Sequence, residues 1–72
     1  MELTSGTEYR ADGTWVRLQA ILAGGTATLF CRSAAAPAAS QVEVMSEGFV
    51  DVNPPLLGYY SVVLTGSAKV YG

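Results

Sequence analysis

Apolar and polar residues alternate with a period of two along several short runs of the chain. In residues 15–22 every even position is apolar, while Arg17 and Gln19 hold odd positions. Residues 26–32 alternate in the same way, and Gly24-Gly25 between the two runs can supply the positive φ angles of a tight turn. This pattern predicts two half-buried strands that pair with each other as one β-hairpin.

Further strands are expected in the second half of the chain, at residues 41–45, 49–52, 59–65 and 68–71. The Ala/Pro-rich stretch at residues 33–40 predicts a loop or a bridge between sheets, because Pro37 would remove a hydrogen bond from a short helix. Pro54-Pro55 ends a strand, since proline cannot donate to a ladder. No helix-sized crossover separates any two strands, so the expected fold is all-β, a small antiparallel β-sandwich or barrel of five to six short strands.

The chain length of 72 residues allows one domain. Residues 1–8 are mostly polar and predict an N-terminal arm or a short edge strand, and residues 9–72 predict a single β domain. A chain this short buries only about 60% of its unfolded surface and usually needs a staple or a partner. Cys31 is the only cysteine and histidine is absent, so we expect no internal disulfide, no metal and no cofactor. Oligomerisation or docking on a larger body is the remaining source of stability.

Charge is sparse, at 14% of the residues, which is typical of a buried interface more than of a free monomer with a Ser/Thr/Gly surface. The net charge is −2 and the four basic residues are scattered, so we expect no nucleic-acid partner. The longest uncharged run, residues 52–68, contains prolines and alternates, so we expect no membrane span. The N-terminus lacks the basic and apolar parts of a signal peptide, which predicts synthesis in the cytoplasm.

Catalytic chemistry has few candidates, because the commonest general base, histidine, is absent. Cys31 lies on the expected inner face of its strand, where a buried structural thiol is favoured over a nucleophile. Glu43, Glu47 and Asp51 form the closest carboxylate group and allow a glycosidase-like pair or a calcium site. Solvated strand and turn carboxylates are the favoured interpretation, and the expected protein is not an enzyme.

Aromatic side chains are the better candidates for binding. Alternation places Tyr60 inward and Tyr59 nearer the surface. Trp15 lies on the polar face beside Arg17 and is the strongest candidate for an interface anchor. The expected interface residues are Trp15, Arg17, Tyr59 and Tyr71. Exposed aromatics of this kind can also stack on sugars, so a carbohydrate-binding module stays open as an alternative.

The order of the sequence motifs resembles a group of small β-sandwich proteins from the virions of tailed bacteriophages. The resemblance covers residues 13–72 and rests on GGTATL at residues 24–29, GFVDV at 48–52, PP at 54–55, GYYSVVLTG at 58–66 and AKVY at 68–71. Members of that group often carry a tryptophan in the loop after the first motif, whereas residues 33–41 here are Ala/Pro-rich. A contact that the family makes through this loop would therefore differ in this chain.

The resemblance implies a structural component of a phage virion. The expected function is that of a capsid cement or decoration subunit that self-associates and stabilises the shell. Its partners would be further copies of itself, for which virion symmetry favours a trimer, and a major capsid or other virion protein. A neck, tail or fibre component, or a carbohydrate-binding adhesion module, is the alternative.

Overall fold

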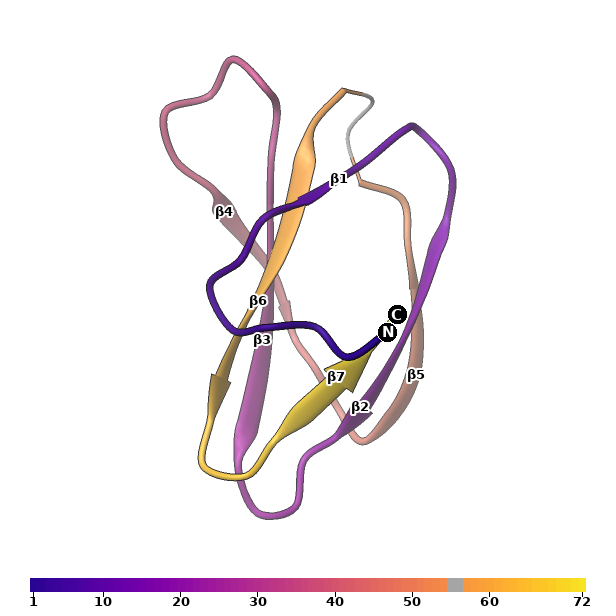
Figure 1. Ribbon diagram of the computed structural model, residues 1–72, viewed down its shortest axis with the longest axis vertical. Helices are drawn as coiled ribbons and strands as arrows, with labels where there is room; N and C mark the ends of the chain where they lie inside the picture. Colours follow the sequence, from indigo (N-terminus) through magenta and orange to yellow (C-terminus); the bar gives the residue numbers. More distant parts are fainter. Residues whose placement is uncertain (55–56) are drawn as a thin grey trace.

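The computed structural model describes residues 1–54 and 57–72, and these contain seven strands and no helix (Figure 1). The strands are β1 (Tyr9–Arg10), β2 (Val16–Ile21), β3 (Thr26–Arg32), β4 (Ser40–Val44), β5 (Gly48–Val52), β6 (Tyr59–Thr65) and β7 (Lys69–Tyr71). Six of them lie where the alternation predicted strands, and the two-residue β1 is additional. Pro55, the second proline of the predicted strand end, lies outside the described residues.

The strands form two antiparallel sheets that face each other as a small sandwich (Figure 1). One sheet has the order β1-β6-β3-β4 and the other the order β5-β2-β7. Every strand pair among the described residues is antiparallel. The predicted fold class, an all-β antiparallel domain, is therefore confirmed.

The predicted hairpin between residues 15–22 and 26–32 is wrong, because β2 and β3 belong to different sheets. The tight turn itself exists: the Gly25 N–H donates to the Leu22 carbonyl at 2.8 Å, and Ala23 and Gly24 have φ angles of 48° and 84°. This turn connects two strands that lie in opposite sheets and face each other across the core, whereas a hairpin turn connects two strands that are hydrogen-bonded to each other. A hairpin would put the apolar sides of both strands on one face of one sheet, whereas this arch lets them cover each other.

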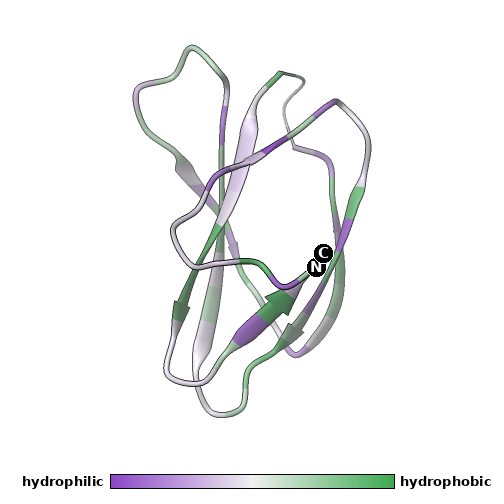
Figure 2. Ribbon diagram, viewed as in Figure 1, coloured by the Kyte–Doolittle hydropathy of each residue, from purple (hydrophilic) through white to green (hydrophobic). Residues whose placement is uncertain are grey.

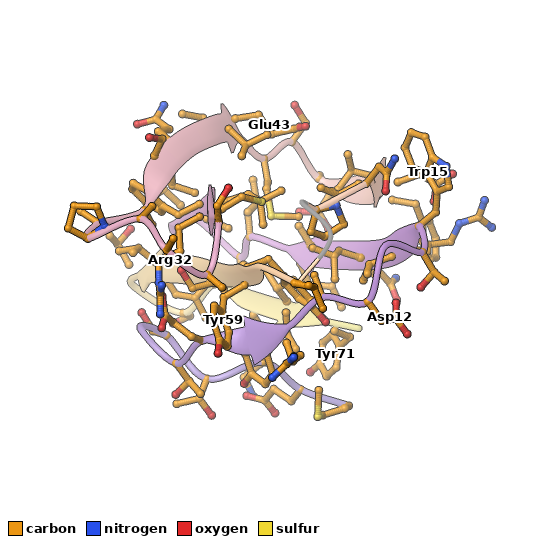
Figure 3. The ribbon with its side chains drawn as sticks, turned by 90° about the horizontal axis from the view of Figure 1, so that it is seen from above. Asp12, Trp15, Arg32, Glu43, Tyr59 and Tyr71 are labelled. Atoms are coloured by element: carbon orange, nitrogen blue, oxygen red, sulfur yellow. The ribbon has the colours of Figure 1, made fainter. Side chains whose placement is uncertain are left out.

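Short connections of the same kind link β4 to β5 and β6 to β7. Among the described strands, only β3 and β4 are consecutive and share a sheet, so the stretch at residues 33–40 is a loop and the alternative of a bridge between sheets is wrong. The consequence is that β4 and β5 are both edge strands and lie along one side of the sandwich. Figure 3, which looks along the long axis, shows β4 and β5 on that side and the N-terminal segment on the opposite side.

The N-terminal segment closes the side of the sandwich opposite β4 and β5 (Figure 1). The Leu3 N–H donates to the Val70 carbonyl at 2.8 Å, and Glu2 forms an isolated bridge with Tyr71. Further along, the Gly6 N–H donates to the carbonyl of Val62 in β6 at 2.9 Å. The first residues thus run from the edge of β7 to β6, and the Leu3 side chain, 1% exposed, enters the core.

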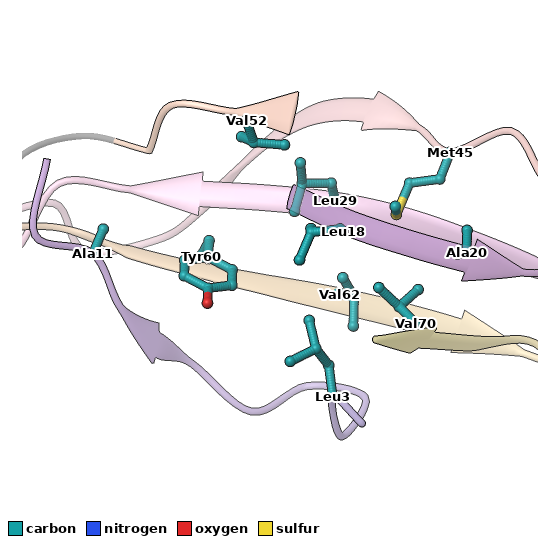
Figure 4. Packing of buried hydrophobic residues seen from close by; sticks show 11 residues of the cluster. Leu3, Ala11, Leu18, Ala20, Leu29, Met45, Val52, Tyr60, Val62 and Val70 are labelled. Atoms are coloured by element: carbon teal, nitrogen blue, oxygen red, sulfur yellow. The ribbon is translucent and has the colours of Figure 1, made fainter. Parts of the chain in front are cut away.

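The core lies between the sheets and draws on strands from both (Figure 4). Its fully buried large side chains are Leu3, Leu18, Leu29, Val62 and Val70. Along β2 the apolar and polar residues alternate as the sequence predicted (Figure 2). Tyr60 is buried and stacks on Tyr9, whereas Tyr59 is half-buried, so the predicted orientation of the two adjacent tyrosines is confirmed.

Candidate functional site: the outer face of the three-stranded sheet

The outer face of the β5-β2-β7 sheet brings together three of the four predicted interface residues. The odd positions of β2 point outward, because Leu18 and Ala20 between them are fully buried. The strand register places Asp51 beside Arg17, and it places Phe49 and Tyr71 on either side of Gln19. Ile21 and Lys69 pair further along. Trp15 precedes β2 at the far end of this row.

Large apolar side chains on this face are open to solvent. Trp15 is 67% exposed, Phe49 is 69% exposed and Ile21 is 42% exposed. Burying a side chain of this size contributes about 1.5–3 kcal/mol relative to leaving it in water. Aromatic residues are also enriched among the few residues that dominate binding energy at protein interfaces. Covering these exposed apolar side chains with a partner surface would therefore favour binding.

A fixed ion pair crosses the middle of the face. Arg17 Nε donates to Asp51 Oδ1 at 2.8 Å and Arg17 Nη2 donates to Asp51 Oδ2 at 3.1 Å. The hydrogen bonds from Arg17, and then its charge, lower the pKa of Asp51. A two-pronged pair of this geometry holds both side chains in one arrangement. It gives the face an ordered polar centre between Trp15 and the row that contains Phe49.

Tyr59, the fourth predicted interface residue, lies on the other sheet. The Arg32 guanidinium sits 4.5 Å from the centre of the Tyr59 ring. Arg32 also forms a two-pronged pair with Glu8, in which its Nη2 donates to Glu8 Oε1 at 2.8 Å. This hydrogen bonding lowers the pKa of Glu8. Figure 3 shows Trp15 and Arg32 at opposite sides of the molecule, so Tyr59 does not extend the face that Trp15 occupies.

Arg32 also holds the Ala/Pro-rich loop between β3 and β4. Its Nη1 lies 3.4, 3.2 and 3.3 Å from the carbonyl oxygens of Ser33, Ala34 and Ala36. The Ala36 N–H donates back to the Ser33 carbonyl at 3.0 Å. One guanidinium thus connects the loop, β6 through Tyr59 and the N-terminal segment through Glu8, which gives Arg32 and Tyr59 a structural task.

The sequence did not point to Phe49 and Ile21. The alternation along β5 could have indicated that Phe49 is exposed, because Asp51, two positions later, lies on the same face of the strand and marks that face as polar. Ile21 carried the same signal, since it follows Arg17 and Gln19 at odd positions of β2. Both residues are apolar on an otherwise polar side, which is the pattern of an exposed interface residue.

The carboxylates considered for catalysis or calcium binding are dispersed. Asp51 is paired with Arg17 on the outer face, and Glu47 Oε1 accepts a hydrogen bond from the Leu22 N–H at 2.9 Å. Glu43 is exposed on β4. Within residues 1–54 and 57–72, no group of three or more metal-ligating side chains forms and no pocket is found.

Cys31 is half-buried at the inner side of β3 and packs against the core. Burial raises the pKa of its thiol, because desolvation disfavours the charged thiolate. A reactive cysteine needs the opposite shift. Its position fits the structural thiol that the alternation predicted.

Comparisons of the chain with models of protein families, with curated proteins and with solved structures give no match. The described part of the chain contains no helix with the length and apolar character needed to cross a membrane.

Proposed function

We propose that this protein is a non-enzymatic structural subunit of a phage virion, a capsid cement or decoration subunit that self-associates. It docks on the shell through the outer face of the β5-β2-β7 sheet. The observation that carries the docking proposal is the exposure of Trp15 and Phe49 on one face of the sheet, at 67% and 69%. Assignment to a virion is supported by the sequence resemblance over residues 13–72.

The geometry of this face suits a protein partner. Its side chains other than Trp15 stand on paired strands, so a rigid ladder holds their backbone, and Trp15 directly precedes β2. The Arg17–Asp51 pair is already formed, so little side-chain freedom is lost when it is covered. Trp15 and Phe49 lie on either side of this pair, and aromatic and arginine side chains are the types enriched at protein interfaces.

Carbohydrate binding is the second candidate, and Trp15 is the observation that favours it. Its ring is exposed, Thr14 directly precedes it in the chain, and Arg17, which is paired with Asp51, follows two positions later. An exposed aromatic ring beside ordered polar groups is also how a sugar can be stacked and hydrogen-bonded. The Trp15→Ala substitution distinguishes the two candidates, because it should abolish virion incorporation under the first and glycan binding under the second.

The test is to assay incorporation of the chain into gradient-purified virions by quantitative mass spectrometry. We expect the wild-type chain in stoichiometric copies and a strong loss with Trp15→Ala. The control is Val63→Ala, which removes an exposed residue from the outer face of the other sheet and should be incorporated normally. Absence of the wild-type chain from virions contradicts the proposal. Glycan binding that is lost in Trp15→Ala, with incorporation unchanged, supports the second candidate instead.

A further inference from the structure

Of the sheet edges among the described residues, those on the β4–β5 side are open. On the opposite side, the edge of β7 is bridged by Glu2 and takes a hydrogen bond from Leu3. β1, the edge strand beside β6, is only two residues long and continues from that closing segment. In contrast, β4 and β5 each have five residues and one paired neighbour. A strand with one paired neighbour offers a row of backbone N–H and C=O groups to another chain.

β5 is the less protected of the two open edges. β4 carries a β-bulge, because its register against β3 shifts at Val42, and bulges discourage edge pairing. β5 pairs with β2 without a shift and contains neither proline nor lysine. Within residues 1–54 and 57–72, its backbone makes no hydrogen bond outside that ladder. Phe49 stands exposed on its outer side.

We propose that a second copy of this chain pairs with β5, so that the two β5 strands run antiparallel about a two-fold axis at Val50. This proposal deepens the self-association in the proposed function and rests on it. The result is a continuous six-stranded sheet with the order β7-β2-β5 in one copy followed by β5-β2-β7 in the other. It makes the assembly a dimer in place of the trimer that virion symmetry favours.

A second copy fits this edge because both open edges lie on the same side of the sandwich. A closed ring such as a trimer uses two different surfaces of each copy, whereas a two-fold dimer uses one surface twice. When the β4–β5 side of one copy docks against the β4–β5 side of the other, this surface is therefore covered in both copies. On the far side, the described residues leave only the two-residue β1 as an edge with one paired neighbour, because the N-terminal segment bridges β7.

The register centred on Val50 pairs β5 with its copy along the full length of the strand. Inward residues must face inward residues across the pair, so only registers that keep this parity are allowed. Centring on Val50 aligns all five residues of Gly48–Val52 and places Phe49 opposite Asp51 of the other copy. Centring on Asp51 would oppose two carboxylates, and centring on Phe49 would align only three residues of the strand.

A charge-swap at Phe49 tests the pairing. Phe49→Glu places a carboxylate opposite Asp51 of the other copy, whereas Phe49→Lys places an ammonium there, and both remove the same apolar ring. We expect sedimentation equilibrium to give a dimer dissociation constant about three- to tenfold weaker for Phe49→Glu than for Phe49→Lys, because two symmetric pairs change sign while Arg17 offsets part of the Asp51 charge. Equal dissociation constants for the two variants, or a wild-type mass of three copies, overturn the proposal. Circular dichroism checks that both variants fold.

Cross-linking gives an independent test. In a Cys31→Ala background, Val50→Cys places two thiols across the two-fold axis, where opposite residues are about 4.5–5.5 Å apart between Cα atoms, within disulfide range. We expect a covalent dimer on mild oxidation, and little from the control Val63→Cys on the other sheet. Failure of Val50→Cys to cross-link, or equal cross-linking of the control, overturns the pairing. Virion incorporation of the wild-type chain is measured separately, so a failed dimer and a failed virion assignment give different results.

Discussion

Replacing Gly25 by alanine will drive a methyl group into the backbone of β6. A Cβ atom built at Gly25 lies 2.1 Å from the carbonyl oxygen of Thr65 and 3.1 Å from the backbone nitrogen of Ala68. Ordinary carbon–oxygen contacts begin at about 3.3 Å, so the chain must shift by about 1 Å to admit the methyl group. The obstacle is backbone, which Thr26 also ties down through hydrogen bonds to the Thr65 hydroxyl.

The expected destabilisation is about 3 kcal/mol, the upper end of the usual range for overpacking, because the clashing atoms cannot rotate away. A domain of this size has a total stability of about 4–11 kcal/mol, so the change removes a large part of it. The melting temperature should fall by about 12–24 °C. Urea denaturation followed by circular dichroism measures the free energy, and a thermal scan measures the melting temperature.

Gly24→Ala is the matched control for Gly25→Ala. Gly24 has a φ of 84° and open space around its Cβ position, so alanine there meets only the left-handed backbone penalty of about 1–2 kcal/mol. Gly25 lies outside that left-handed region, so its cost is the close approach of β6 alone. If Gly25→Ala proves no more destabilising than Gly24→Ala, the arch between β2 and β3 does not pass against β6 as described.

Three further outcomes are expected. Leu29→Ala, at a fully buried position, should lower the free energy of unfolding by about 2–5 kcal/mol in urea denaturation. Val63→Ala, on the outer face, should change that free energy by less than about 0.5 kcal/mol. Similar changes in the two variants would contradict the assigned core. The lowered pKa values of Glu8 and Asp51 mean that their stabilisation is present above the ordinary values of 4.5 and 3.8 and is lost as pH falls through the lower folded values. Acid titration of stability should show this decline, with a smaller decline in Glu8→Gln, and a flat acid profile would refute it. Alkylation of Cys31 should be slow in the native protein and fast in urea, and equal rates would exclude the raised pKa and partial burial described for the thiol.

The strands themselves could be predicted from the sequence, because each is a local alternation between turn residues. The partner of each strand could not be predicted, since Gly24-Gly25 forms the same tight turn whether it joins paired or facing strands. The choice depends on long-range burial. Leu3, Met45 and Val70, which are distant in sequence, complete the core only when β2 and β3 lie in different sheets. Leu3 also stands alone in a polar run, so no periodicity pointed to it.

The candidate site divides in the same way. Parity placed Trp15 and Arg17 together on the polar side of one strand, and the structure confirms this placement. Tyr71 lies on the same face as Trp15 and Tyr59 does not, because β7 shares a sheet with β2 and β6 belongs to the other sheet. The local sequence pattern does not show which strands share a sheet. Phe49 joins the face for the same reason, through its pairing with β2.

Self-association through one open side of the sandwich is the central claim, and the solution mass of the purified chain tests it most directly. Sedimentation equilibrium over a series of protein concentrations should show a mass that rises from 7.5 kDa toward twice that value. A mass that stays at 7.5 kDa up to the highest soluble concentration would contradict the claim.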